Sequence, residues 1–188
     1  MSKLKYLSIL FLAAIILSGC KKRETFENNV FFDKTFNWEI AIPDDYEKVN
    51  QKEQVEKGAP LLIETKNSIV AFKRDNKNYF SANYEDVTGD NRSVDLNLRL
   101  KDFLFLKKIG QLYPKGKMGD YAVTSENISG LKFRKSKIAV TENGKTVATV
   151  VIFSSIFIDK VFTASIVYED EEYGNAMINL FQKSTFKQ

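Results

Sequence analysis

The dipeptide Asn143-Gly144 constrains the fold of this chain more tightly than any other feature. It is the preferred dipeptide for a two-residue type I′ hairpin turn, because both central residues of that turn need a positive φ. It stands between strand-like runs at residues 131–142 and 145–158. A further turn at Asp159-Lys160 leads into residues 161–168, which completes a predicted three-strand antiparallel meander.

The apolar positions within this meander predict how its strands are covered. Residues 150–153 are apolar at every position, so their strand should be central and buried on both faces. In the preceding strand the apolar positions are odd up to Phe133 and even from Ile138 onward. A bulge within residues 134–137 would restore the phase.

Further strands and helices are predicted on both sides of residue 100. Strands are expected at residues 38–42, 68–73 and 79–87, and a loop at 115–119. Residues 51–66 are expected to hold a helix that is interrupted near Gly58 and Pro60. Leucines at 96, 98 and 100 alternate as in a strand, but the long run before Gly110 without a breaker favours a helix from about residue 93 to 113. The helical spacing of Tyr173, Ala176, Met177, Leu180 and Phe181 predicts a closing amphipathic helix.

The first twenty residues have the pattern of an export signal. Lys3 and Lys5 precede an apolar run at residues 6–17, which has about 12 residues and is too short for the roughly 20 that span a bilayer. The run ends in Leu-Ser-Gly-Cys, which resembles the lipobox of a bacterial lipoprotein. That resemblance implies a signal peptide at 1–19, a diacylglyceryl group on Cys20, a tether at 20–35, and a globular domain at 36–188.

Lipidation predicts a location in the bacterial cell envelope. Two or three acyl chains are sufficient for stable attachment. In enterobacterial lipoproteins an Asp directly after the lipidated cysteine signals retention in the inner membrane. The residues after Cys20 are basic, so that signal is absent here. We therefore expect the outer membrane, facing the periplasm, in a Gram-negative host. The net charge of +4 falls to +2 once Lys3 and Lys5 are removed, too little to indicate nucleic-acid binding.

The composition excludes several kinds of catalytic and metal site. The chain has no histidine, and Cys20 is its only cysteine, so Ser-His, Cys-His and His-metal sites and internal disulfides are impossible. The acidic run at 169–172 offers oxygen ligands for Ca²⁺, but its spacing matches no EF-hand loop, and helix-start charge is the favoured interpretation. Asp44-Asp45 and Glu85-Asp86 could form an acid/base couple, although strand neighbours point to opposite faces. No catalytic residue, metal ligand or cofactor is predicted.

Four basic residues form the best candidate interaction surface. Lys132, Arg134, Lys135 and Lys137 follow one another along a predicted strand. They could dock an acidic partner or lipid headgroups. Alternatively, they protect an edge strand against self-pairing, a known role of edge lysines. Trp38, Tyr79 and Tyr84 could face a partner as well, but aromatic residues on alternating strands are more often core.

The order of these elements resembles the PsbP-like group, named after an extrinsic protein of photosystem II. The resemblance rests on an early aromatic strand ending in Ile42-Pro43, the mid-chain helix, the meander, and a closing helix that ends in Ser184-Thr185-Phe186. It covers residues 36–186. It implies an α+β fold in which an antiparallel sheet is sandwiched between helices.

The group includes small bacterial lipoproteins and some secretion chaperones, and its members mostly bind proteins or assist assembly. The resemblance therefore implies a non-catalytic, lipid-anchored binding or assembly module with an envelope protein as its partner. The alternatives are a carrier of a small apolar ligand and a hydrolase that uses carboxylates alone. An apolar pocket with a few convergent polar groups would favour the carrier.

Overall fold

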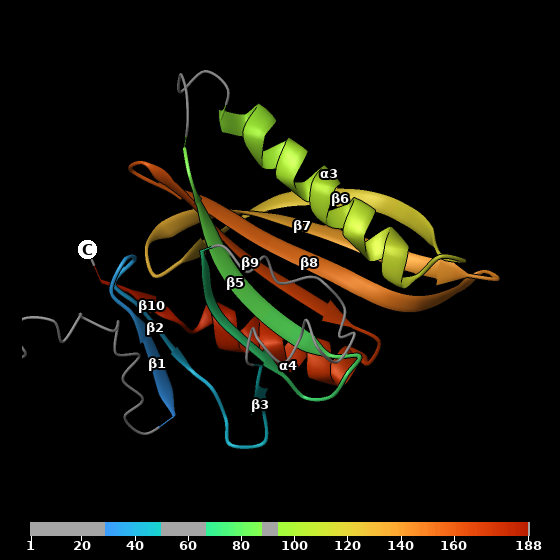
Figure 1. The fold of residues 1–188 in the computed structure, drawn as a ribbon, viewed down its shortest axis with the longest axis horizontal. Coiled ribbons are helices and arrows are strands. Elements are labelled where there is room, and N and C mark those ends of the chain that lie inside the picture. Colours follow the sequence, from blue (N-terminus) through green and yellow to red (C-terminus); the bar gives the residue numbers. More distant parts are fainter. Residues whose placement is uncertain (1–28, 50–66, 88–93, 188) are drawn as a thin grey trace, which may run out of the picture.

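Two antiparallel sheets form most of the structure. The computed structural model describes residues 29–49, 67–87 and 94–187 (Figure 1). The larger sheet has the strand order β3-β4-β5-β9-β8-β7-β6. Its strands are β3 (Glu47–Lys48), β4 (Ser68–Lys73), β5 (Tyr79–Asp86), β6 (Lys117–Ile128), β7 (Leu131–Glu142), β8 (Lys145–Phe157) and β9 (Lys160–Tyr168).

The smaller sheet brings the two ends of the described chain together. It consists of β1 (Val30–Asp33), β2 (Trp38–Ala41) and β10 (Thr185–Phe186), with β2 in the middle. Trp38 on β2 is fully buried, and its indole N–H donates a hydrogen bond to the Ser184 hydroxyl at 2.9 Å. The paired indole N–H is satisfied inside the core, as a buried Trp requires.

Helices α3 (Val94–Leu112) and α4 (Glu171–Gln182) lie on opposite sides of the larger sheet (Figure 1). On the α4 side, Met177 and Phe181 pack into an aromatic core that also includes residues of the small sheet. On the α3 side, Ile109 packs into a second core. Strand β8 supplies both cores, since Val151 and Phe153 face α4 and Val150 and Ile152 face α3. The predicted central, doubly covered strand is confirmed.

The expected sheet sandwiched between helices overstates the helical part. The described chain is mostly β-sheet, one helix packs on each face, and the small sheet shares the α4 side with α4. No helix in the described ranges is long and apolar enough to cross a bilayer.

The meander has one strand more than the sequence predicts. Strand β6 pairs with β7 from Lys117 to Ile128, where a loop was expected at 115–119. The bulge predicted within 134–137 is absent, because pairing with β6 and β8 runs through those positions without a shift. The apolar positions of β7 change from odd to even because both faces of the strand are buried. Phe133 packs in the α4-side core, and Val140 packs in the α3-side core.

Two further boundaries differ from the prediction or lie outside the described residues. Strand β1 falls inside the range 20–35 that was assigned to the tether, because it pairs with β2 and buries Phe31. The signal peptide, Cys20 and the helix expected at 51–66 lie outside the described residues. The other predicted strands and both predicted helices after residue 93 are present.

Candidate functional site

Strand β6 is the last strand of the larger sheet in the described residues, so one of its sides lacks a neighbouring strand. Its hairpin to β7 turns at Ser129-Gly130, with φ of 52° and 80°, which is the geometry of a type I′ turn. In such a hairpin Ile128 and Leu131 are a hydrogen-bonded pair. Antiparallel pairing alternates, so the N–H and C=O groups of residues 121, 123, 125 and 127 point away from β7.

The stretch 121–127, called the β6 edge below, has few of the features that protect a free strand. It contains no proline and no lysine, and its single charged residue, Glu126, is paired with Lys135 at 3.0 Å. Tyr121 and Val123 are exposed by 42% and 45%, large fractions for apolar side chains. A register shift between Met118 and Tyr121 ends the regular pairing on one side. Unprotected edges of this kind are templates for a further strand.

A polar cluster beneath α3 holds Tyr121 in place. Asp102 of α3 is 3% exposed and accepts hydrogen bonds from Tyr121, Arg134 and Ser136. The Arg134 guanidinium also donates to the Tyr121 hydroxyl at 2.7 Å and lies 5.7 Å from the centre of its ring. The Tyr121 hydroxyl is thus fixed from below while its ring stays exposed at the edge.

Burial and hydrogen bonds shift the pKa values of Tyr121 and Arg134 in this cluster. Burial and the hydrogen bond to Asp102 raise the pKa of Tyr121, so its hydroxyl is neutral at physiological pH. Burial acts to lower the pKa of Arg134, but its bonds to Asp102 and Tyr121 raise that pKa above the usual value. The cluster is therefore an ion pair of Arg134 with Asp102, supported by two neutral hydroxyls.

A row of polar side chains crosses the α3-side face of the sheet. Ser154 lies opposite Arg134 on one side and Thr163 on the other, and Thr163 lies opposite Asn83. A second row includes Ser81, opposite Ser165. The hydroxyls of Ser81, Ser154 and Ser165 are buried and have no hydrogen-bond partner within the described part of the chain. This face therefore combines an apolar half under Ile109 with a hydroxyl-lined half.

The four predicted basic residues do not form one patch. Arg134 faces α3 and pairs with Asp102, whereas Lys135 faces the α4 side, pairs with Glu126 and lies 5.1 Å from the centre of the Phe153 ring. Lys132 and Lys137 are exposed, on opposite faces of the strand. Edge protection does not explain them, because β7 pairs on both sides and the edge strand is β6.

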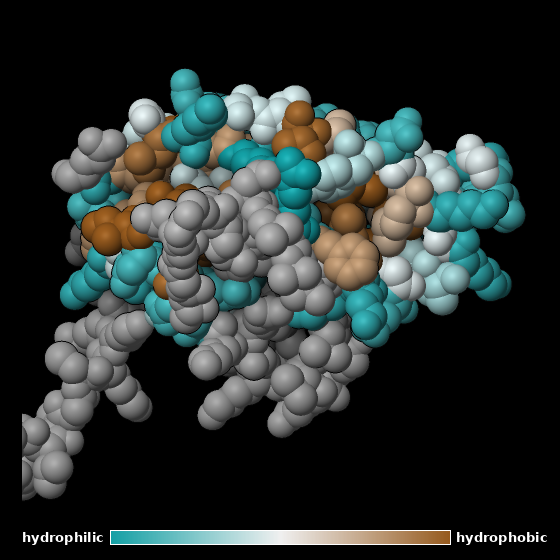
Figure 2. Space-filling view, turned by 90° about the horizontal axis from the view of Figure 1, so that it is seen from above, coloured by the Kyte–Doolittle hydropathy of each residue, from teal (hydrophilic) through white to brown (hydrophobic). Residues whose placement is uncertain are grey.

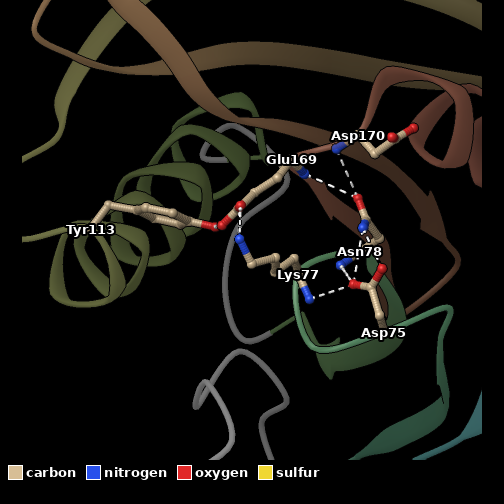
Figure 3. Close-up of polar contacts among 6 residues, drawn as sticks. All are labelled: Asp75, Lys77, Asn78, Tyr113, Glu169 and Asp170. Carbon is tan, nitrogen blue, oxygen red and sulfur yellow. Dashed lines mark hydrogen bonds and ion pairs between the residues drawn. The ribbon is translucent and has the colours of Figure 1, made fainter.

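The acidic run 169–172 is used to begin α4 and to fix its approach. The Asp170 carboxylate caps the helix by accepting from the N–H groups of Glu172 and Tyr173 at 2.9 and 3.1 Å. Glu169 pairs with Lys77 at 2.7 Å and accepts from the Tyr113 hydroxyl at 3.2 Å (Figure 3). The run thus joins α4, the β4–β5 turn and Tyr113, which follows the end of α3. The predicted helix-start role holds for Asp170.

Asn78 and Asp75 complete this junction. The buried Asn78 side chain accepts from the N–H groups of Glu169 and Asp170 and donates to the Asp75 carboxylate (Figure 3). Burial acts to raise the pKa of Asp75, but hydrogen bonds from Lys77 and Asn78 lower it below its ordinary value. In the described ranges no group of three or more acidic or cysteine side chains is placed to hold a metal ion.

The remaining candidates have structural surroundings. Trp38 and Tyr79 are core residues, as the alternating strands suggested, and Tyr84 packs partly buried against Phe36. Asp45 pairs with Arg74, and Asp86 pairs with Lys160 at 3.2 Å. The Asp44 carboxylate also accepts a hydrogen bond from the Asn29 side chain at 2.5 Å.

Sequence reasoning missed the β6 edge and Asp102. Residues 117–128 are exposed at all but two positions, so no alternation of apolar and polar residues marks the strand. Asp102 sits in a helix whose apolar face is interrupted, and its partner Arg134 lies 32 residues away. The turn dipeptide Ser129-Gly130 was the available signal for the hairpin.

No protein-family model and no curated protein matches this chain. Among solved structures it is similar to the solution structure of cyanobacterial PsbP (CyanoP) from Synechocystis sp. PCC 6803, with a TM-score of 0.56 and 12% identity over 92% of this chain and 99% of that one. The fold is PsbP-like. This similarity confirms the predicted resemblance at the level of the fold.

A second solved structure is also similar in fold to this chain. It is a crystal structure from Bacteroides thetaiotaomicron VPI-5482, with a TM-score of 0.50 and 10% identity. The match covers 87% of this chain and 50% of the other, so this chain spans half the length of that protein. At these identities both similarities concern the fold alone.

Proposed function

We propose that this protein is a non-catalytic docking module, anchored to the bacterial envelope by a lipid on Cys20, whose β6 edge binds a protein segment in extended conformation. The observation that carries the proposal is the unprotected edge at residues 121–127. Four residues there present backbone N–H and C=O groups outward, and two exposed apolar side chains accompany them. Strand addition satisfies these backbone groups and takes specificity from the alternate side chains.

The polar cluster under α3 suits the edge to binding. Tyr121 is exposed as a ring and fixed at its hydroxyl by Arg134 and Asp102. A side chain that is already held loses little conformational freedom when a partner covers it. The cluster thereby prepares the edge for a partner.

The proposed location rests on the leader sequence that ends at Cys20. Lipidation of Cys20 places the domain at the envelope, in the outer membrane facing the periplasm in a Gram-negative host. Membrane fractionation of a Cys20→Ser variant tests this: unlipidated, uncleaved precursor is expected. Normal processing and normal membrane association of that variant would contradict the anchor.

Docking through β6 is tested by crosslinking in cells. A photo-reactive amino acid at Val123 is expected to give a discrete adduct, whereas the same group at the exposed Asn179 on α4 gives none. With the photo-reactive group at Ser125 instead, Val123→Lys should abolish the adduct, because the added charge opposes pairing at the edge. Equal or absent adducts at both sites would refute a docking role for β6.

A further inference from the structure

The β6 edge is complementary to a copy of itself, and we infer that its occupant is the β6 edge of a second copy of this chain. The inference rests on the proposed docking role of β6 and adds the identity of the partner. Two edges would align antiparallel about a twofold axis, which joins the two larger sheets into one continuous sheet. Dimers with a twofold axis are the commonest protein oligomers.

The register of this pairing follows from the limits of the edge. Regular strand geometry runs from Tyr121 to Asn127, between the register shift after Met118 and the turn at Ser129-Gly130. Both copies use this whole stretch only if the twofold axis passes through its central residue, Thr124. Residue 121 then lies opposite 127 of the second copy, and 123 opposite 125.

This register also fits the hydrogen-bonding pattern of the strand. Residues 121, 123, 125 and 127 point their backbone groups outward, and in this register they face one another across the new interface. The two Thr124 residues form a non-hydrogen-bonded pair, in which facing Cα atoms lie about 4.5 Å apart. A Thr-Thr pair is among the cross-strand pairs that stabilise sheets.

The charges permit the contact. Glu126 is the only charged residue of the edge, it is paired within its own copy to Lys135, and it would face Ala122 of the second copy. Shifting the axis to Val123 shortens the shared regular stretch and sets Glu126 opposite Asp120, which are like charges. The length of the shared stretch therefore selects the Thr124 register, and the like charges also disfavour a shift of the axis toward Val123.

The placement of the side chains adds an apolar component. Tyr121 and Val123 lie on the α3-side face, as the bonds from Tyr121 to Asp102 and Ser136 show. A twofold axis perpendicular to the sheet keeps the same face of both copies on one side, so the exposed apolar side chains of both copies gather there. The space-filling view shows apolar side chains emerging among polar ones on the α3 side (Figure 2).

Cysteine crosslinking of the full chain in membranes tests the inference and its register. In Thr124→Cys the two thiols face each other at a separation that suits a disulfide. A dimer that disappears on reduction is expected after mild oxidation. In the matched control Ala122→Cys, the thiols lie four residues apart along the strand, about 13 Å, and cannot bridge. The unmodified chain controls for Cys20.

A second variant separates loss of pairing from loss of folding. Val123→Lys on the Thr124→Cys background should weaken association about tenfold or more, because each interface carries the substitution twice and edge lysines oppose pairing. Position 123 is exposed, so the intrinsic fluorescence of the buried Trp38 should stay unchanged. Thr124→Cys and Ala122→Cys crosslinking equally would overturn the inference.

The outcomes distinguish this inference from the proposed function. A discrete adduct with a different protein at Val123, without a Thr124→Cys disulfide, overturns self-pairing and leaves the docking role intact. Loss of both the adduct and the disulfide overturns both. A disulfide that forms in Thr124→Cys alone, and is suppressed by Val123→Lys, supports both.

Discussion

Replacing Gly174 with alanine should destabilise the protein, although alanine favours helices. Gly174 lies in the first half of α4, directly over the buried ring of Tyr168. A Cβ atom on residue 174 would lie 2.3 Å from Cγ of Tyr168 and 2.4 Å from one of its Cδ atoms. These atoms form the base of the ring next to its Cβ, so turning the ring about the Cβ–Cγ bond does not move Cγ away from the helix.

The expected size follows from two opposing effects. Overpacking a core costs about 1–3 kcal/mol, and the depth of this overlap places it near 3. Alanine gains about 1 kcal/mol over glycine inside a helix. The free energy of unfolding should therefore fall by about 2 kcal/mol, measured by urea denaturation followed by circular dichroism.

Two controls isolate the contact with Tyr168. Asn175→Ala, at the next and exposed position, should raise stability by a few tenths of a kcal/mol, because only helix propensity changes there. In a Tyr168→Ala background the penalty of Gly174→Ala should disappear, as a double-mutant cycle reports. A Gly174→Ala variant as stable as the parent chain would refute the close approach of α4 to the sheet.

Three further perturbations test the core, the cluster and the junction. Phe181→Ala should lower the unfolding free energy by about 3–5 kcal/mol in urea titrations, and a loss below 1 would show that the aromatic core is loose. Asp102→Ala should cost about 3–5 kcal/mol because it leaves Arg134 unpaired, and adding Arg134→Met should recover most of that loss; no recovery would contradict the ion pair. The lowered pKa of Asp75 stabilises the fold above its ordinary pKa of 3.8, and this stabilisation is lost as pH falls through the folded value. Asp75→Asn should therefore flatten the stability curve in that acid range, and an unchanged curve would exclude this carboxylate as its source.

Local patterns predicted most of the C-terminal meander. The turn residues Asn143-Gly144 and the apolar run at 150–153 each carry information about their own strands, and the structure has both strands where they were expected. The type of the segment after Ser93 was also predictable, because a long run without a breaker favours a helix. These features depend on neighbours in the chain.

The interaction surface depended on neighbours in space. In the sequence, the basic residues of β7 look like one patch: Lys132, Arg134, Lys135 and Lys137. Side chains alternate along a strand, so these residues lie on two faces of β7. Arg134 pairs with Asp102, and Lys135 pairs with Glu126. Only the pairing of strands shows that β6, beside β7, ends the larger sheet in the described residues. Strand β6 could not be predicted from its sequence pattern. Because most of its residues face solvent, they do not alternate between apolar and polar, which is the usual sequence signal of a strand.

The sequence by itself determined the leader pattern at Cys20, the absence of histidine chemistry, and the order of most strands and helices, since these rest on residue identity and short-range spacing. The tertiary structure alone decided which strand ends the described sheet, which carboxylate meets Arg134, and why Gly174 must lack a side chain. Each of those features joins segments that are distant in the chain or sets the close approach of packed elements. Such contacts are fixed by the packing of the sheet and its helices, so no local pattern records them.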